Sequence, residues 1–109
     1  MNIALIGYGK MGKMVEQAAL ARGHRIGFKV DIELNEQGQL LTAENFAGID
    51  VAIDFTVPSA VPVTVDKLSQ LGVSMVVGTT GWLAQLEEVR HMVEARNVGL
   101  VYGSNFSIG

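Results

Sequence analysis

Residues 1–31 of the chain read MNIALIGYGKMGKMVEQAALARGHRIGFKVD. They divide into an apolar run, the glycine-rich segment GYGKMG at 7–12, an amphipathic stretch, a second apolar run and a final acid, Asp31. The run at 2–6 is nearly continuous in apolar residues, which is typical of a strand buried on both faces of a parallel sheet. The order strand, glycine-rich turn, helix, strand and acid predicts a unit that binds a dinucleotide.

The three glycines of this segment have separate physical roles in such a unit. Gly7 permits the tight turn out of the strand, Gly9 lets a pyrophosphate approach the backbone, and Gly12 lets the helix lie close to the strand. The N-terminus of that helix offers unpaired N–H groups and the positive end of a dipole to a phosphate. Asp31 is placed to accept hydrogen bonds from an adenosine ribose. A glycine-rich turn without a ligand is the other interpretation of the motif.

The length, the hydrophobic content, the cysteine count and the charge of the chain limit the class of protein to which it can belong. The chain has 109 residues, the size of one domain, and 49% of them are hydrophobic. No apolar run approaches the ~20 residues that span a bilayer, and glycines interrupt the N-terminal run before it resembles a signal sequence. The chain has no cysteine, and its net charge is −3 with scattered Lys and Arg. We therefore expect a cytoplasmic protein without a disulfide framework, a membrane segment or nucleic acid as a partner.

The rest of the chain alternates apolar runs with amphipathic stretches. We expect strands at 2–6, 26–30, 51–55, 73–77 and 98–102, and helices at 10–22, from the turn at 56–59 to 71, and at 83–96. The inward faces of the helices should carry Met11, Val15, Ala18 and Ala19, then Val61, Val65, Leu68 and Leu71, then Leu86, Val89 and Val93. Segment 32–48 has no sustained period, and we expect a loop there with one short turn at 43–46.

Strands that alternate with helices predict right-handed βαβ units and one doubly wound, Rossmann-like parallel sheet of about five strands in a single α/β domain. If 32–48 adds no strand, the strand order is 2-1-3-4-5. Ligands then bind at the carboxyl ends of the first strand and the strand at 51–55, where the winding reverses. Three polar or glycine-rich turns converge on that edge, at 7–12, 54–56 and 78–81.

Four segments stand in a characteristic order: GYGKMG at 7–12, IDFT at 53–56, GTTGW at 78–82 and SNFSIG at 104–109. Together they resemble the dihydrodipicolinate reductases, also called 4-hydroxy-tetrahydrodipicolinate reductases, of bacterial lysine and diaminopimelate synthesis. The resemblance covers the whole chain but only the nucleotide-binding half of such an enzyme. It implies a reductase that transfers hydride from NADH or NADPH to a cyclic, imine-type dicarboxylate.

The resemblance also implies which residues bind the cofactor. The loop at 7–12 would hold the pyrophosphate, Asp31 the adenosine ribose, and the loop at 78–80 the nicotinamide. The full set of expected cofactor-binding residues is Gly7, Tyr8, Gly9, Lys10, Met11, Gly12, Asp31, Phe55, Thr56, Gly78, Thr79, Thr80, Gly103, Ser104, Asn105 and Phe106. Some members carry a basic residue after the ribose-binding acid, where this chain has Ile32, and we therefore expect NADH to be favoured.

The resemblance further implies that cofactor binding and catalysis belong to different domains of the full-length protein. Residues 1–102 would form the dinucleotide-binding domain, and 103–109 a hinge leading to an absent domain that carries the catalytic and substrate-binding groups. We therefore expect no catalytic residue in these 109 residues, and with two histidines and no cysteine we expect no metal site either. The fragment should be a monomer without turnover, whereas the full-length protein should be a homotetramer with a small dicarboxylate substrate.

Two other classes of protein share parts of this pattern. A phospho-acceptor receiver domain also has an acid at the end of its third strand (Asp54) and a threonine after its fourth (Thr79 or Thr80). Receivers, however, need acids after the first strand and a lysine at the fifth, and this chain has neither. The second alternative is a Rossmann module that senses NAD or coenzyme A without chemistry. Apart from these alternatives, we expect Asp54 to cap a turn rather than to contact a ligand, and Trp82 to anchor the next helix by packing.

Overall fold

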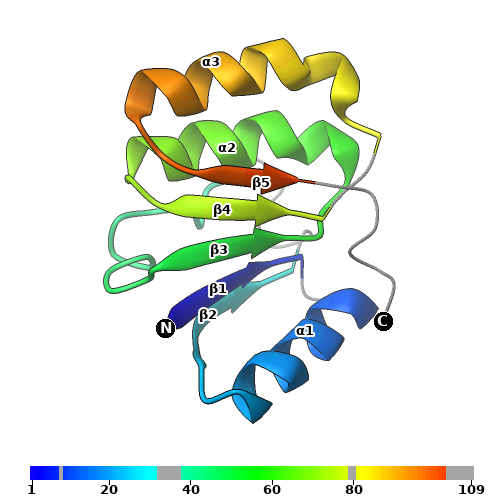
Figure 1. Cartoon of the computed structure of the whole chain (residues 1–109), viewed down its shortest axis with the longest axis vertical. Helices are drawn as coiled ribbons and strands as arrows, with labels where there is room; N and C mark the ends of the chain where they lie inside the picture. Colours follow the sequence, from blue (N-terminus) through cyan, green and yellow to red (C-terminus); the bar gives the residue numbers. More distant parts are fainter. Residues whose placement is uncertain (8, 32–37, 79–80, 103–109) are drawn as a thin grey trace.

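The computed structural model describes residues 1–7, 9–31, 38–78 and 81–102. Within these ranges one sheet has five strands: β1 (Asn2–Ile6), β2 (Arg25–Val30), β3 (Val51–Asp54), β4 (Ser74–Val77) and β5 (Leu100–Tyr102). Neighbouring strands are parallel, and the order is β2-β1-β3-β4-β5, with all arrowheads pointing to one edge of the sheet (Figure 1). The predicted doubly wound sheet with order 2-1-3-4-5 is confirmed.

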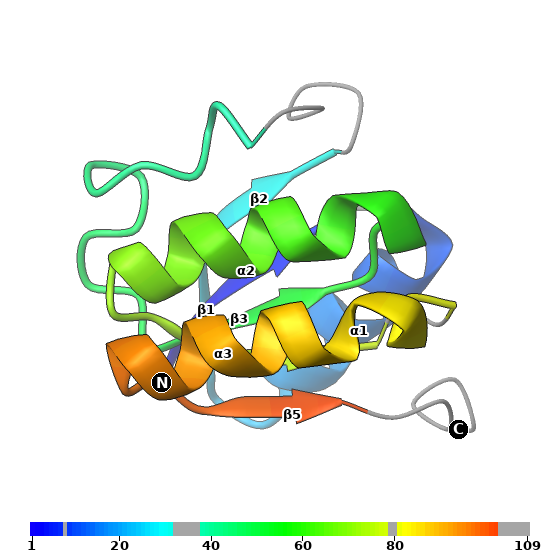
Figure 2. The ribbon, with the colours of Figure 1, turned by 90° about the horizontal axis from the view of Figure 1, so that it is seen from above.

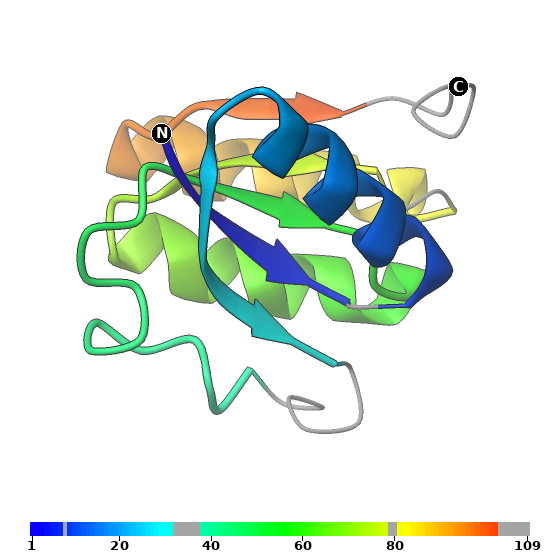
Figure 3. The same ribbon diagram turned by 90° about the horizontal axis from the view of Figure 1, so that it is seen from below.

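Three α-helices cover the sheet: α1 (Lys10–Ala21), α2 (Val61–Gln70) and α3 (Leu86–Arg96). Helices α2 and α3 lie side by side on one face (Figure 2), whereas α1 crosses the opposite face over β1 (Figure 3). The two helices of the first face are each preceded by a short 3₁₀ turn, Pro58–Ala60 and Leu83–Gln85. No helix in the described part of the chain is long and apolar enough to cross a membrane.

The predicted element bounds differ from the structure at a few ends. Strand β5 begins at Leu100 and not at 98, because α3 ends on Asn97 in the left-handed conformation, with φ of 56°. The next residues then turn back toward the sheet, where the Gly99 amide donates to Ser74 Oγ at 3.1 Å. Strands β3 and β4 are each one residue shorter than expected.

The larger core lies between the sheet and the α2–α3 layer. Val61, Val65 and Leu68 of α2 and Val89 of α3 are fully buried there, as their helical spacing predicts. The segment before β3 contributes two further core side chains, Leu41 and Phe46, each 4% exposed. The Phe46 amide donates to Thr42 O at 3.0 Å, which forms the short turn expected near 43–46.

The smaller core lies under α1. Ile3 and Leu5 of β1 pack there against Ala19, and Gly12 of the same helix is buried as well. Small residues on this face let the helix lie close to the strands. Ala18, which was expected to face inward, is exposed instead. The contact stripe of α1 runs through 12, 15 and 19, and Ala18 lies beside it.

Strand β2 contains a bulge at Gly27. The pairing with β1 joins Ile3 to Ile26 and then Ala4 to Phe28, so that Gly27 is skipped. Ile26 therefore packs in the smaller core under α1, whereas Phe28 packs in the larger core, with its ring 5.3 Å from that of Phe46. The extra residue reverses which side chains of β2 face α1.

One ion pair joins α2 to α3 and makes stability depend on pH. Arg96 donates to Asp66 Oδ1 at 2.7 Å, and this bond, with a smaller contribution from Gln70, holds the pKa of Asp66 below its ordinary value of 3.8. Since the folded-state pKa is depressed, the stabilisation is present above the unfolded pKa and is lost as pH falls through the folded one.

Asp66→Asn should therefore lower the free energy of unfolding at pH 7 by about 0.5–1 kcal/mol, since both side chains are partly solvated. The difference from the wild type should shrink at acid pH, as the pH falls through the depressed folded-state pKa of Asp66. Urea unfolding at pH 7 and at acid pH measures it. Glu94→Gln, which removes a longer and more exposed pair with Arg90 at 3.8 Å, is the matched control and should change little. A difference that persists at the acid pH would show that the charge is not its cause.

Candidate functional site

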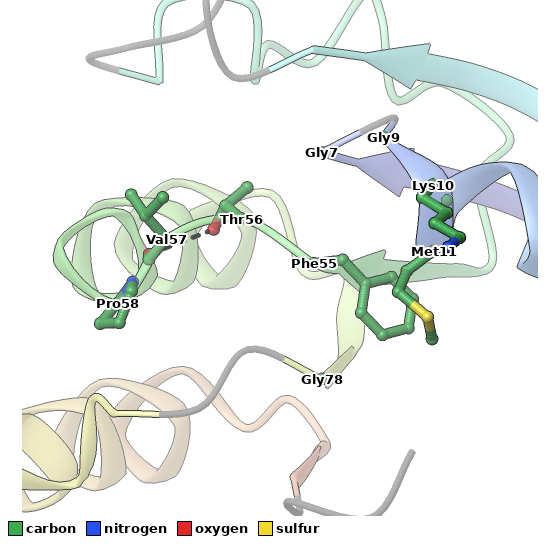
Figure 4. Close-up of a pocket in the computed structure, with 10 residues that line it drawn as sticks. Gly7, Gly9, Lys10, Met11, Phe55, Thr56, Val57, Pro58 and Gly78 are labelled. Carbon is green, nitrogen blue, oxygen red and sulfur yellow. Dashed lines mark hydrogen bonds between the residues drawn. The ribbon is translucent and has the colours of Figure 1, made fainter. Parts of the chain in front are cut away.

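A pocket of about 520 Å³ opens at the carboxyl edge of the sheet, where β1, β3 and β4 end. Its size falls in the range of small-molecule sites. Figure 4 shows Lys10 and Met11 of α1 on one side of it and Val57 and Pro58 across from them. The described residues that line it are Gly7, Gly9, Lys10, Met11, Gly12, Phe55, Thr56, Val57, Pro58 and Gly78.

Backbone hydrogen bonds fix the start of each of the three turns around the pocket. The amide of Gly7 donates to Val30 O, that of Phe55 to Ile6 O, and that of Gly78 to Asp54 O, each at 2.8 Å. Each turn therefore begins on the last carbonyl of a neighbouring strand. The sheet sets the relative positions of these turns, so the pocket has a rigid base.

The three turns approach one another closely at Phe55. Gly7 has φ of +89°, and a Cβ there would lie 2.7 Å from the carbonyl oxygen of Phe55, so only glycine fits. A Cβ on Gly78 would lie 2.1 Å from the Phe55 ring. Gly9 differs from both, because among the described residues, its chain neighbours apart, a Cβ on it would meet no heavy atom within 4 Å. The space beside Gly9 belongs to the pocket, as a backbone that binds a phosphate requires.

The N-terminus of α1 faces the pocket, and its first turn lacks both a side-chain cap and an acidic residue. Gly9 is the N-cap. The first turn contains Lys10 and Lys13, both exposed, although cations at this end oppose the helix dipole. Among the described residues, the donors and charges at this helix end therefore all favour an anion.

Asp54 is the last residue of β3, directly before the lining residue Phe55, and it is fully buried. Its Oδ1 accepts a hydrogen bond from the Thr56 amide at 2.7 Å, which is the turn cap expected from the sequence. Thr56 Oγ1 in turn donates to the carbonyl of Val57 at 3.4 Å (Figure 4). Asp54 thus shapes the turn that presents Phe55 and Thr56 to the pocket.

The structure brings together half of the residues predicted to bind a cofactor: Gly7, Gly9, Lys10, Met11, Gly12, Phe55, Thr56 and Gly78. Asp31 lies at the end of β2, exposed and outside the pocket lining. The other predicted residues, Tyr8, Thr79, Thr80, Gly103, Ser104, Asn105 and Phe106, lie outside the described residues. That these residues bind a cofactor stays a prediction.

Sequence reasoning missed two lining residues, Val57 and Pro58. They belong to a turn that the sequence does identify, but only the path of its backbone places them beside the glycine loop. Trp82 is 2% exposed, with its ring edge-on to Tyr102 at 5.2 Å, which confirms the expected packing role. His91 is exposed on α3, and no group of three or more potential metal ligands occurs among the residues described.

Comparisons with known proteins show which proteins the chain is similar to. A family model described as "Dihydrodipicolinate reductase, N-terminus" matches residues 1–106. A 4-hydroxy-tetrahydrodipicolinate reductase of Christiangramia forsetii is 38% identical over 109 residues, which are the whole of this chain and 44% of that protein. Relatives with the same name from Cupriavidus taiwanensis and Cupriavidus necator are 35% and 34% identical over the whole chain and 48% of each relative. The chain spans about half the length of these curated relatives.

Proposed function

The chain belongs to the dihydrodipicolinate reductase family, and from this premise we propose that residues 1–102 are the nicotinamide dinucleotide-binding domain of a 4-hydroxy-tetrahydrodipicolinate reductase. The enzyme would act in lysine and diaminopimelate biosynthesis in the cytoplasm. The observation that carries the proposal is the open space at Gly9, beside a helix N-terminus that bears lysines and no acid.

The residues of the pocket fit such a cofactor. Amides at the start of α1 would bind the pyrophosphate, with Gly9 leaving room for it and Lys10 adding positive charge. Asp31 would accept hydrogen bonds from the adenosine ribose at the end of β2. Gly78 and the turn after it would lie by the nicotinamide. When bound, the reduced nicotinamide supplies a hydride.

The lining residues also bear on the groups that the substrate and its reduction would need. Lys10 is the single cationic side chain among the described lining residues, and it lies at the proposed pyrophosphate position. A dicarboxylate substrate needs cationic groups, and its reduction needs a proton donor. We propose that both come from the part of the enzyme beyond these 109 residues, as does the assembly of a tetramer.

The test compares cofactor binding with turnover. NADH at about 100 times its dissociation constant should raise the free energy of unfolding of the 109-residue chain by ~2.7 kcal/mol. The same chain should show no measurable reduction of 4-hydroxy-tetrahydrodipicolinate, whereas the full-length protein reduces it. Turnover by the fragment at about one percent of the full-length rate would contradict the proposal that the proton donor lies outside these 109 residues. Binding without turnover by the full-length protein would favour a sensing module.

Cofactor preference gives a second prediction, which rests on Asp31. A charged hydrogen bond to the ribose contributes ~1.5–3 kcal/mol, and the same carboxylate repels a 2′-phosphate. Asp31→Asn should therefore weaken NADH binding about tenfold or more and leave NADPH binding unchanged or tighter. Calorimetric titration of both nucleotides measures this. A wild-type chain that binds NADPH tenfold more tightly than NADH would overturn it.

A further inference from the structure

A row of apolar side chains crosses the sheet on the face that carries α1. Leu5, Ile53, Val76 and Val101 are paired in register along β1, β3, β4 and β5. The residues that alternate with them on β4 and β5 pack toward the larger core, so Val76 and Val101 face the side of α1. Exposure rises along the row: Leu5 is 1% exposed, Ile53 and Val76 are partly buried, and Val101 is 58% exposed. The row therefore loses its cover toward β5.

Helix α1 covers only one half of this face. It packs mainly against β1 and β2, and Figure 3 shows it in front of the sheet, with α2 and α3 behind. Glu16 of α1 lies 3.0 Å from Lys29 of β2, so this flank of the helix faces β2. Ala18 lies two residues further, about 200° around the helix, and therefore on the opposite flank. Its exposure places an apolar side chain of α1 beside the uncovered half of the sheet.

This half of the sheet is suited to a further layer of protein. Parallel sheets are almost always covered on both faces, and apolar side chains gathered on an exposed surface mark a contact with other protein. From β3 to β5 the face is two strand spacings wide, about 10 Å, which is the diameter of one helix. More chain is available in the relatives, because the matching family model describes a reductase N-terminus and the chain covers 44% of one such reductase.

We propose that one helix from the part of the full-length enzyme beyond residue 109 packs on β4 and β5 beside α1. Its apolar stripe would lie on Ile53, Val76 and Val101, with Ala18 at its side. A second copy of the chain fits this surface less well, since a stable dimer buries about 800 Å² on each partner, more than these few side chains expose. The proposal goes beyond cofactor binding and does not rest on it.

Thiol labelling of the full-length enzyme tests whether the surface is covered. Val101→Cys places a small probe on the row, and Leu20→Cys is the matched control, because Leu20 is 54% exposed on the flank of α1 that carries Glu16. Residues 1–109 contain no cysteine, and peptide mass mapping reads each introduced thiol separately from any other. Cys at 101 should react at least about fiftyfold more slowly than Cys at 20, because it reacts only when the helix detaches. Rates within about threefold of each other would overturn the proposal.

Photo-cross-linking identifies what covers the surface. The full-length enzyme with the photo-reactive p-benzoylphenylalanine in place of Val101 is irradiated, digested and analysed by mass spectrometry. Cross-links should join position 101 to one segment beyond residue 109 whose apolar residues recur at helical spacing. Cross-links confined to residues 1–109, whether of the same chain or of a second copy, would overturn the proposal. An enzyme that fails to bind NADH would contradict the proposed function and leave this inference unchanged.

Discussion

Gly7→Ala is expected to lower the free energy of unfolding by about 3–5 kcal/mol, a large part of the stability of a domain of this size. Two costs add at this position. A residue with a Cβ is strained at φ of +89°, and that Cβ would lie 2.7 Å from the Phe55 carbonyl oxygen, which is backbone and cannot rotate away. The carboxyl ends of β1 and β3 would have to separate.

Urea unfolding of the wild type and the variant measures this loss. Gly23→Ala is the matched control, because Gly23 has a similar φ of +83° but open space at its Cβ position. It should pay only the conformational strain, about 1–2 kcal/mol. Equal losses in the two variants would show that the contact between the first two turns contributes nothing.

Gly9→Val is expected to remove most of the stabilisation by cofactor while leaving the fold intact. In the described part of the chain, sequence neighbours aside, no heavy atom lies within 4 Å of a Cβ at Gly9, so the added side chain enters the space proposed for the pyrophosphate. The ligand-free variant should lose no more than about 1 kcal/mol, the scale of an altered N-cap. The ~2.7 kcal/mol gained by the wild type at 100 times its dissociation constant should largely disappear.

Thermal and urea unfolding with and without NADH provide the measurement. Gly23→Ala again serves as the control: it is destabilised in the ligand-free state, but it should retain the full shift on adding NADH. A Gly9→Val variant that NADH stabilises as much as the wild type would show that the nucleotide does not approach this backbone.

Local patterns were sufficient to predict the sheet. The nearly continuous apolar run of β1 indicates burial on both faces of the sheet, and the helical spacing of Val61, Val65 and Leu68 indicates the buried face of α2. The turn at Gly7 could be predicted because Phe55 approaches so closely there that a side chain does not fit. These features depend on neighbours in sequence or on one strand-to-strand contact.

Features that depend on distant packing could not be predicted. Leu41 and Phe46 belong to a stretch without periodicity, yet both are buried in the core, where the Phe46 ring packs against that of Phe28. The bulge that turns Phe28 inward had one local signal, a glycine inside a strand, which is typical of bulges. Val57 and Pro58 line the pocket only through the path of their turn.

The most direct test of the proposed cofactor site is an NMR titration of the 109-residue chain with NADH, followed through the backbone amide signals. We expect the largest shifts at Gly9 and Gly12, at Phe55 and Thr56, and at Gly78, which line one pocket from three separate turns. Amides of the groove between α3 and β5, such as those of Arg90 and Val98, should stay unchanged. Shifts confined to that groove, or no shifts at millimolar NADH and NADPH, would contradict the assignment of the glycine-loop pocket as a dinucleotide site.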